Sequence, residues 1–156
     1  MADTALTPEA LLAHWRGHRR LTRRTIEAFA ERDLFGFTPT DMRSFGAMML
    51  EVIALTKPVV EGALDGSWHF GRGGGDVEVS KAELLAAFDE ADAVIAETLP
   101  QVPPERFLEV DAPIPGRSEP VVSTLLYFID NEIHHRGQGY VYLRLLGMEP
   151  PPFYVR

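Results

Sequence analysis

A carboxylate stands on a predicted apolar helix face at Glu51. It shares one side of the helix with Ala47, Met48, Leu55 and Pro58 at three- and four-residue spacing. Burying a lone carboxylate costs several kcal/mol, so such a group is paired, protonated or bound to a metal. The alternative is that Glu51 lies at the edge of the apolar stripe and reaches water.

A second set of polar residues lies within the last predicted helix, at residues 130–138. Asn131 and His135 are four residues apart and therefore stack on one side, and Asp130 and His134 form an offset stacked pair. Either pair could supply two metal ligands from adjacent turns, because imidazole and oxygen donors suit a divalent ion. A hydrogen-bonded core histidine is the alternative. The first pair shares its side with Thr124, Phe128, Tyr142 and Leu146, and the second with Tyr127, Val141 and Leu145.

Four amphipathic helices are predicted to position these residues, over about 7–32, 40–64, 80–99 and 118–146. On the first, His18 lies on the apolar side as a core or rim residue. A solvated face is expected for the arginines of this first helix, with a surface for an anion or an acidic partner as the alternative. A solvated face is also expected for the carboxylates of the third helix. Gly137 and Gly139 predict close approach of another backbone. The arginines are Arg16, Arg19, Arg20, Arg23 and Arg24, and the carboxylates are Glu83, Asp89, Glu90, Asp92 and Glu97.

The pattern predicts an all-α fold, a four-helix bundle with long inter-helix connections, formed by a single domain over residues 1–156. The glycine cluster at residues 71–75 lacks the lysine and hydroxyl ending of a phosphate-binding loop and is expected to be a flexible connection. One short extended piece is expected at about residues 107–110. The tail, residues 148–156, is expected to be extended and to pack back on the body.

Composition excludes several classes of function. The chain of 156 residues is 46% hydrophobic, has no cysteine and carries a formal charge of −8. The charge argues against nucleic-acid binding, and the lack of cysteine excludes disulfides and thiolate sites. We expect no membrane span and no signal peptide, and hence a cytoplasmic location.

The motif His134-His135-Arg136-Gly137-Gln138, continuing through residues 140–147 to three prolines at 150–152, resembles the DinB/YfiT-like family. The stretch from Met42 to Gly46 resembles the second helix of that family. The resemblance implies a four-helix bundle in which three histidines hold a divalent metal. It also implies thiol-dependent transferase relatives and homodimers.

In this chain the resemblance places His135 at one ligand position, but Asn131 and Glu51 where the family has histidines. A Glu/Asn/His set would be harder than three imidazoles. The ion (Zn, Ni, Mn or Fe) stays undetermined, as do a low-molecular-weight thiol cofactor and the small-molecule substrate.

Two functions follow as hypotheses. The first is a metal-dependent enzyme of transferase or hydrolase type, in which Glu51, Asn131 and His135 bind the metal and His134, Arg136 and Tyr142 assist catalysis. The second is a degenerate, metal-free bundle in which Glu51 bonds directly to His135. That protein would act as a stress-related dimeric binding or interaction module.

Overall fold

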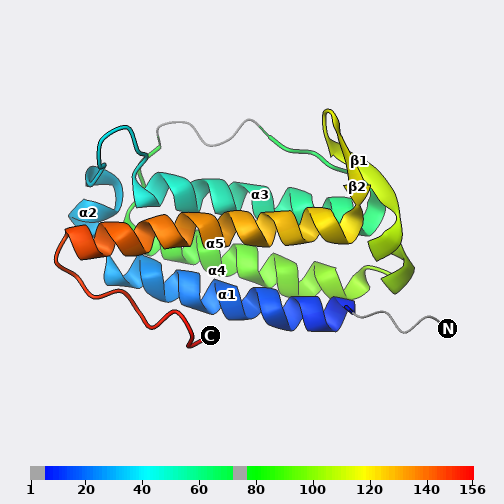
Figure 1. Ribbon diagram of the computed structural model, residues 1–156, viewed down its shortest axis with the longest axis horizontal. Helices are drawn as coiled ribbons and strands as arrows, with labels where there is room; N and C mark the ends of the chain where they lie inside the picture. Colours follow the sequence, from blue (N-terminus) through cyan, green and yellow to red (C-terminus); the bar gives the residue numbers. More distant parts are fainter. Residues whose placement is uncertain (1–5, 72–76) are drawn as a thin grey trace.

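Four long helices lie side by side in the computed structural model, which describes residues 6–71 and 77–156 (Figure 1). They are α1 (Pro8–Ala28), α3 (Phe45–Asp65), α4 (Lys81–Thr98) and α5 (Val121–Leu145). The remaining elements are the short helix α2 (Glu31–Gly36), two 3-10 turns (Leu99–Gln101 and Pro104–Leu108) and the strands β1 (Val110–Ile114) and β2 (Arg117–Pro120). The predicted mostly helical bundle is confirmed.

Side-chain caps fix where three of the long helices begin. The Thr7 and Ser44 hydroxyls accept hydrogen bonds from the backbone N–H groups of Ala10 and Ala47. Ser80 and Glu83 form a reciprocal capping box at the start of α4, as the sequence predicted. The caps satisfy backbone donors that have no partner within the helix.

The first helix is shorter than predicted. It ends at Ala28 rather than near residue 32, because Phe29 adopts an extended backbone (φ −71°, ψ 140°). This turn stacks the Phe29 ring on Phe45, with ring centroids 4.7 Å apart. The Lys81 ammonium donates to the carbonyl oxygens of Glu27 and Phe29, at 2.6 and 2.7 Å, so the end of α1 is satisfied from α4. The chain then restarts as α2.

The last helix begins at Val121 rather than near residue 118. Residues 117–120 instead pair antiparallel with β1, and Val110 lies opposite Pro120. Gly116, at φ +80°, allows the tight turn between the strands. The single extended piece predicted at residues 107–110 is therefore misplaced, and the second strand was not predicted. Residues 72–75 of the glycine-rich connection lie outside the described residues.

The apolar core is divided into two clusters along the bundle. One contains Trp15, Val59 and Phe128, and the other contains Ile26, Met48 and Tyr142, which come from the same three helices. On α1, α3 and α5 alike, polar side chains occupy the positions between the clusters, and they are buried: His18, Arg19, Thr22, Thr25, Thr56, Glu132, His135 and Arg136. A polar layer therefore crosses the middle of the bundle.

The two glycines of α5 differ in their surroundings, and the difference can be tested. A Cβ on Gly139 would lie 2.4 Å from the Phe45 ring, whereas one on Gly137 would meet nothing within 4 Å. The predicted close approach of another backbone is therefore wrong at both positions, because the neighbour of Gly139 is the Phe45 side chain and Gly137 has none. We expect Gly139→Ala to lower the free energy of unfolding by about 1–3 kcal/mol through overpacking. Gly137→Ala should raise it by about 0.5–1 kcal/mol through helix propensity. Urea denaturation of the matched pair checks this, and equal effects would contradict the packing described.

The C-terminal segment packs back on α1, as predicted, and runs along the body in Figure 1. Gly147, at φ +76°, ends α5. The Arg24 guanidinium donates to the carbonyl oxygen of Val155, and the Arg156 side chain lies against Gly17. Within the described residues, none of the helices is long and apolar enough to cross a membrane.

Candidate functional site

Glu51 of α3 and His135 of α5 contact each other directly. The imidazole Nε2 lies 3.3 Å from a Glu51 carboxylate oxygen, and Nδ1 lies 2.9 Å from the Gln138 side-chain oxygen. Because an ionised carboxylate only accepts hydrogen bonds, the ring nitrogen that faces Glu51 must carry a hydrogen. The arrangement is the direct pair of the metal-free hypothesis.

Arg43 occupies the other oxygen of Glu51. Its guanidinium forms an ion pair with that carboxylate oxygen, and the Tyr142 hydroxyl holds the Arg43 carbonyl oxygen at 2.9 Å. Partial burial by itself would raise the pKa of Glu51, but the hydrogen bonds and charges of Arg43 and His135 outweigh burial and lower it. Burial raises the pKa of Tyr142. The site is therefore an ionised carboxylate held between a guanidinium and an imidazole.

Asn131 lies beside a different feature. It lines a cavity of about 10 Å³ between α1, α3 and α5, together with Arg19, Thr56 and Trp15. A space of this size is close to the minimum that holds one water molecule. The amide is thus next to a buried guanidinium.

The predicted ligands Glu51, Asn131 and His135 do not fit a divalent cation well. The separation of 3.3 Å between Glu51 and His135 is compatible with two ligands of one ion, which are about 3.4 Å apart in a tetrahedral site. However, Arg43 neutralises Glu51, and Asn131 shares its cavity with a second guanidinium. The residues at 6–71 and 77–156 contain no group of three His, Asp or Glu side chains that could hold a metal.

The residues predicted to assist catalysis lie in different places. His134 is exposed, with its ring 5.2 Å from that of His135. Tyr142 is buried behind Arg43, whereas Arg136 points into the polar layer. Asp130, the partner of His134 in the offset pair, is exposed. The structure brings His134 and Tyr142 to the Glu51–His135 pair but not Arg136, and their catalytic roles stay predictions.

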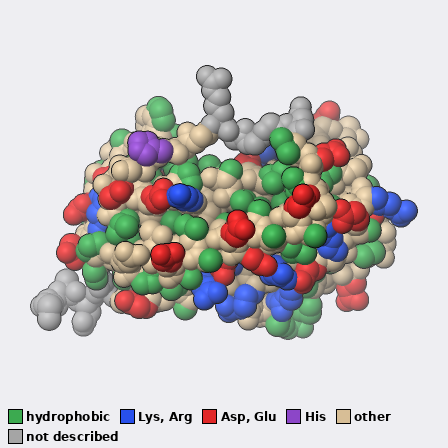
Figure 2. Space-filling view, turned by 180° about the vertical axis from the view of Figure 1, so that it is seen from behind, with side chains coloured by type: hydrophobic (Ala, Val, Ile, Leu, Met, Phe, Trp, Pro, Cys, Tyr) green, Lys and Arg blue, Asp and Glu red, His purple; other side chains and the backbone are tan. Residues whose placement is uncertain are grey.

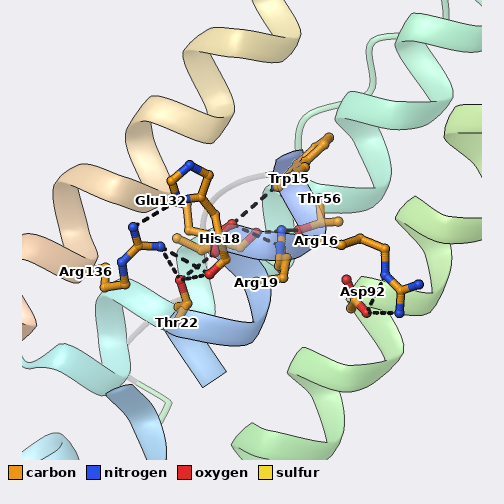
Figure 3. Close-up of polar contacts among 10 residues, drawn as sticks. Trp15, Arg16, His18, Arg19, Thr22, Thr56, Asp92, Glu132 and Arg136 are labelled. Carbon is orange, nitrogen blue, oxygen red and sulfur yellow. Dashed lines mark hydrogen bonds and ion pairs between the residues drawn. The ribbon is translucent and has the colours of Figure 1, made fainter. Parts of the chain in front are cut away.

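The centre of the polar layer is Glu132, which the sequence interpretation did not single out (Figure 3). Its side chain is 1% exposed and lies 2.9 Å from the guanidinium of Arg19, which is 2% exposed. The Thr22 hydroxyl donates to it at 2.6 Å and the Trp15 indole N–H at 3.3 Å. The opposite side of Arg19 donates to Thr56 at 2.5 Å. An ion pair thus joins α1 to α5 at mid-bundle, and a hydrogen bond of the same arginine joins α1 to α3.

Placing Arg19 on a solvated face was wrong, because Arg19 is the buried partner of Glu132. A signal did exist on α5, since Glu132 and Arg136 are spaced by three and four residues from apolar neighbours. These form its buried stripe: Leu125, Ile129, Glu132, Arg136, Gly139 and Leu143. The side chosen for the offset pair, with Tyr127, Val141 and Leu145, is exposed.

Two other arginines of α1 form ion pairs with α4. Arg16 pairs with Asp92 at 2.9 Å and Arg23 with Asp89 at 2.7 Å. Asp89 and Asp92 are therefore not the purely solvated carboxylates that the sequence suggested. Figure 2 shows basic and acidic side chains interleaved along the lower part of the molecule. These exposed pairs each contribute little to stability, at most about 1 kcal/mol.

His18 belongs to the polar layer and lies between two guanidiniums. Arg136 is 3.0 Å from its Nδ1, and Arg156 of the tail is 3.1 Å from its Nε2. The predicted burial of His18 is confirmed. Burial and the charges of Arg136, Arg156 and His14 lower the pKa of His18 from 6.5 to about 4. The ring is therefore neutral at pH 7.

The depressed pKa of His18 predicts a loss of stability in acid. Between pH 6.5 and about 4 the unfolded chain binds a proton at this residue that the folded chain does not. The free energy of unfolding therefore falls as pH is lowered through this window, by on the order of 2 kcal/mol from His18. Urea denaturation at several pH values checks this, with His18→Gln as the non-titrating control. If the variant loses as much stability as the wild type over this window, the assignment to His18 is wrong.

Comparisons with known proteins agree with the fold. A model of the DinB family matches residues 76–156. A DinB-like protein from Bacillus cereus is similar, with 19% identity, a TM-score of 0.75 and coverage of 94% of this chain and 97% of that one. A DinB-like protein from Bacillus subtilis is similar with 21% identity, a TM-score of 0.73 and the same coverage. No curated protein sequence matches.

Proposed function

The chain belongs to the DinB family, and on that basis we propose that it is a metal-independent member. In this proposal the protein is a stress-related binding or interaction module with a DinB-type bundle. The Glu51–His135 pair stands where the resemblance implies a metal centre. In this proposal the positive charge of Arg43 neutralises Glu51 in place of a metal cation.

The observation that supports this proposal is that each carboxylate oxygen of Glu51 has a partner within the protein. One oxygen faces His135 at 3.3 Å and the other is ion-paired with Arg43. A metal at this position would have to replace the hydrogen between the carboxylate and the imidazole, and it would lie near the positive charge of Arg43. Like charges at short range repel strongly where the surroundings are partly desolvated. The direct pair needs no ion to satisfy either group.

Metal and chelator dependence of the melting temperature tests the proposal. A ligand that binds only the native state stabilises it in proportion to the logarithm of its concentration over Kd. We expect EDTA, and then Zn, Ni, Mn or Fe(II), to shift the melting temperature of the wild type by less than about 1 °C. Glu51→Gln should lower it by the same amount with and without chelator, because the lost interaction involves only protein groups.

The opposite outcome would restore the first hypothesis. If EDTA lowers the melting temperature, a metal restores it, and Glu51→Gln abolishes this response, then Glu51 is a ligand. The metal-dependent transferase or hydrolase would then be the better description.

We also propose that the protein is a homodimer that uses the exposed face of α5. Val141 and Leu145 are more than half exposed there, and Met148 beyond the helix is 40% exposed. Tyr127, on the same side of the helix, is 40% exposed, so this side carries a row of exposed apolar side chains of the kind that marks interaction surfaces. Sedimentation velocity should give the mass of two chains, and Leu145→Glu should give the mass of one. A wild-type monomer at high concentration would exclude the dimer.

A further inference from the structure

The surface where the tail crosses α1 carries three arginines beside the buried, neutral imidazole of His18. It consists of His18, Arg20, Arg24 and Arg156, which we call the tail patch. The nearest atoms to an added Cβ at Gly17 belong to Arg156 and to the Arg20 guanidinium, at 3.4 and 3.8 Å. Among the described residues, none of the three arginines of the patch forms an ion pair with a carboxylate, although the whole chain has a charge of −8.

The two ring nitrogens of His18 face more hydrogen-bond donors than acceptors. A neutral imidazole has one N–H and one lone pair, and a guanidinium only donates. Both ring nitrogens nevertheless face guanidiniums, at 3.0 Å from Arg136 and 3.1 Å from Arg156. If Nδ1 accepts from the buried Arg136, the Nε2–H group points at another donor. An acceptor between His18 and Arg156 would satisfy both.

A second donor of the patch also has no partner. The Nε atom of Arg24 is buried without a hydrogen bond, while one terminal nitrogen of the same side chain donates to Val155. The buried layer below the patch holds two further guanidiniums, of which Arg19 forms an ion pair with Glu132 and Arg136 contacts His18 and Thr22. Charge-assisted hydrogen bonds to an oxyanion are about twice as strong as neutral ones.

We propose that the tail patch binds a small oxyanion, the phosphate-type or carboxylate group of a small molecule, between His18, Arg20 and Arg156. Binding needs only a displacement of the exposed Arg156 side chain away from the imidazole. The tail would then close over the ligand from one side and α1 would hold it from the other. The proposal does not depend on the Glu51–His135 pair, so either can fail alone.

A titration at constant ionic strength, followed by NMR of the backbone amides and arginine Nε–H groups, tests this site. The probes are inorganic phosphate, sulfate and acetate, with chloride as the reference. We expect saturable shifts at Gly17, His18 and Arg24 with at least one oxyanion. Phosphate and sulfate acting without acetate would identify a tetrahedral group, and acetate acting alone would identify a carboxylate.

Charge-neutral variants decide whether the named residues bind the anion. Arg20→Gln and Arg156→Gln should each raise the Kd roughly fivefold, and the double variant should raise it further. Arg32→Gln makes the same charge change on an 88% exposed side chain that pairs with Asp33, and it should leave the Kd unchanged. Shifts that do not saturate, or a Kd that changes equally in all three single variants, would overturn the proposal.

Discussion

Replacing Glu132 by alanine is expected to lower the free energy of unfolding by about 3–5 kcal/mol, the usual cost of leaving a buried charge without its partner. Arg19 is 2% exposed and would keep only its hydrogen bond to Thr56. Trp15 would also lose its acceptor, and the Thr22 hydroxyl would keep only the carbonyl oxygen of His18. Most domains of this size are stable by only 5–15 kcal/mol, so the variant should be close to unfolding. Urea denaturation followed by circular dichroism measures the change.

Three further variants keep this prediction testable if Glu132→Ala does not fold. Glu132→Gln retains the shape and an acceptor oxygen and should lose less stability. The double variant Arg19→Met/Glu132→Leu removes both charges and should recover most of the loss, as apolar replacements of buried ion pairs often do. Glu90→Ala removes an exposed carboxylate and should change stability by less than about 0.5 kcal/mol. If Glu132→Ala costs no more than Glu90→Ala, the polar layer does not hold the bundle together.

Restoring imidazoles at positions 51 and 131 is expected to create a metal site. Glu51→His/Asn131→His would place three histidines where the family resemblance implies them, and it would remove the carboxylate that pairs with Arg43. Imidazole is a strong ligand for Zn and Ni. We expect affinity for Zn to rise at least about 100-fold over the wild type, measured by calorimetric titration.

The variant Arg43→Gln provides a control for the predicted gain in affinity for Zn. The Arg43 guanidinium would oppose a cation at the new site, so adding Arg43→Gln to the double variant should increase the affinity again. His135→Ala in the same background should abolish the gain. A double variant that binds Zn no better than the wild type would show that residues 51, 131 and 135 do not converge.

The long elements could be predicted from the sequence because their signals are local. Ser80 and Glu83 mark the start of α4, and Gly147 marks the end of α5. The break at Phe29 depends instead on the ring of Phe45 and on Lys81 of another helix. No local pattern contains such partners. The β2 strand was missed for the same reason, since it forms only by pairing with β1.

Part of the candidate site could be predicted from the sequence, because the pattern of a single helix shows a carboxylate or an imidazole on its apolar face. Glu51 and His135 were named on this ground and they contact each other. Arg43 precedes the helix, so periodicity could not link it to Glu51. Arg19 lies in a run of arginines that resembles a solvated stripe, and only the packing of α5 against α1 shows that one of them faces Glu132.

Diffraction from crystals soaked in zinc, recorded at the zinc absorption edge, would show whether the Glu51–His135 pair binds a metal. We expect no anomalous peak between Glu51 and His135, with Nε2 of His135 still in hydrogen-bond contact with the carboxylate and Arg43 still paired to it. A peak lying about 2.1 Å from both His135 Nε2 and a Glu51 oxygen would be a metal bound at this position. Such a peak would contradict the proposal that the Glu51–His135 pair functions without a metal.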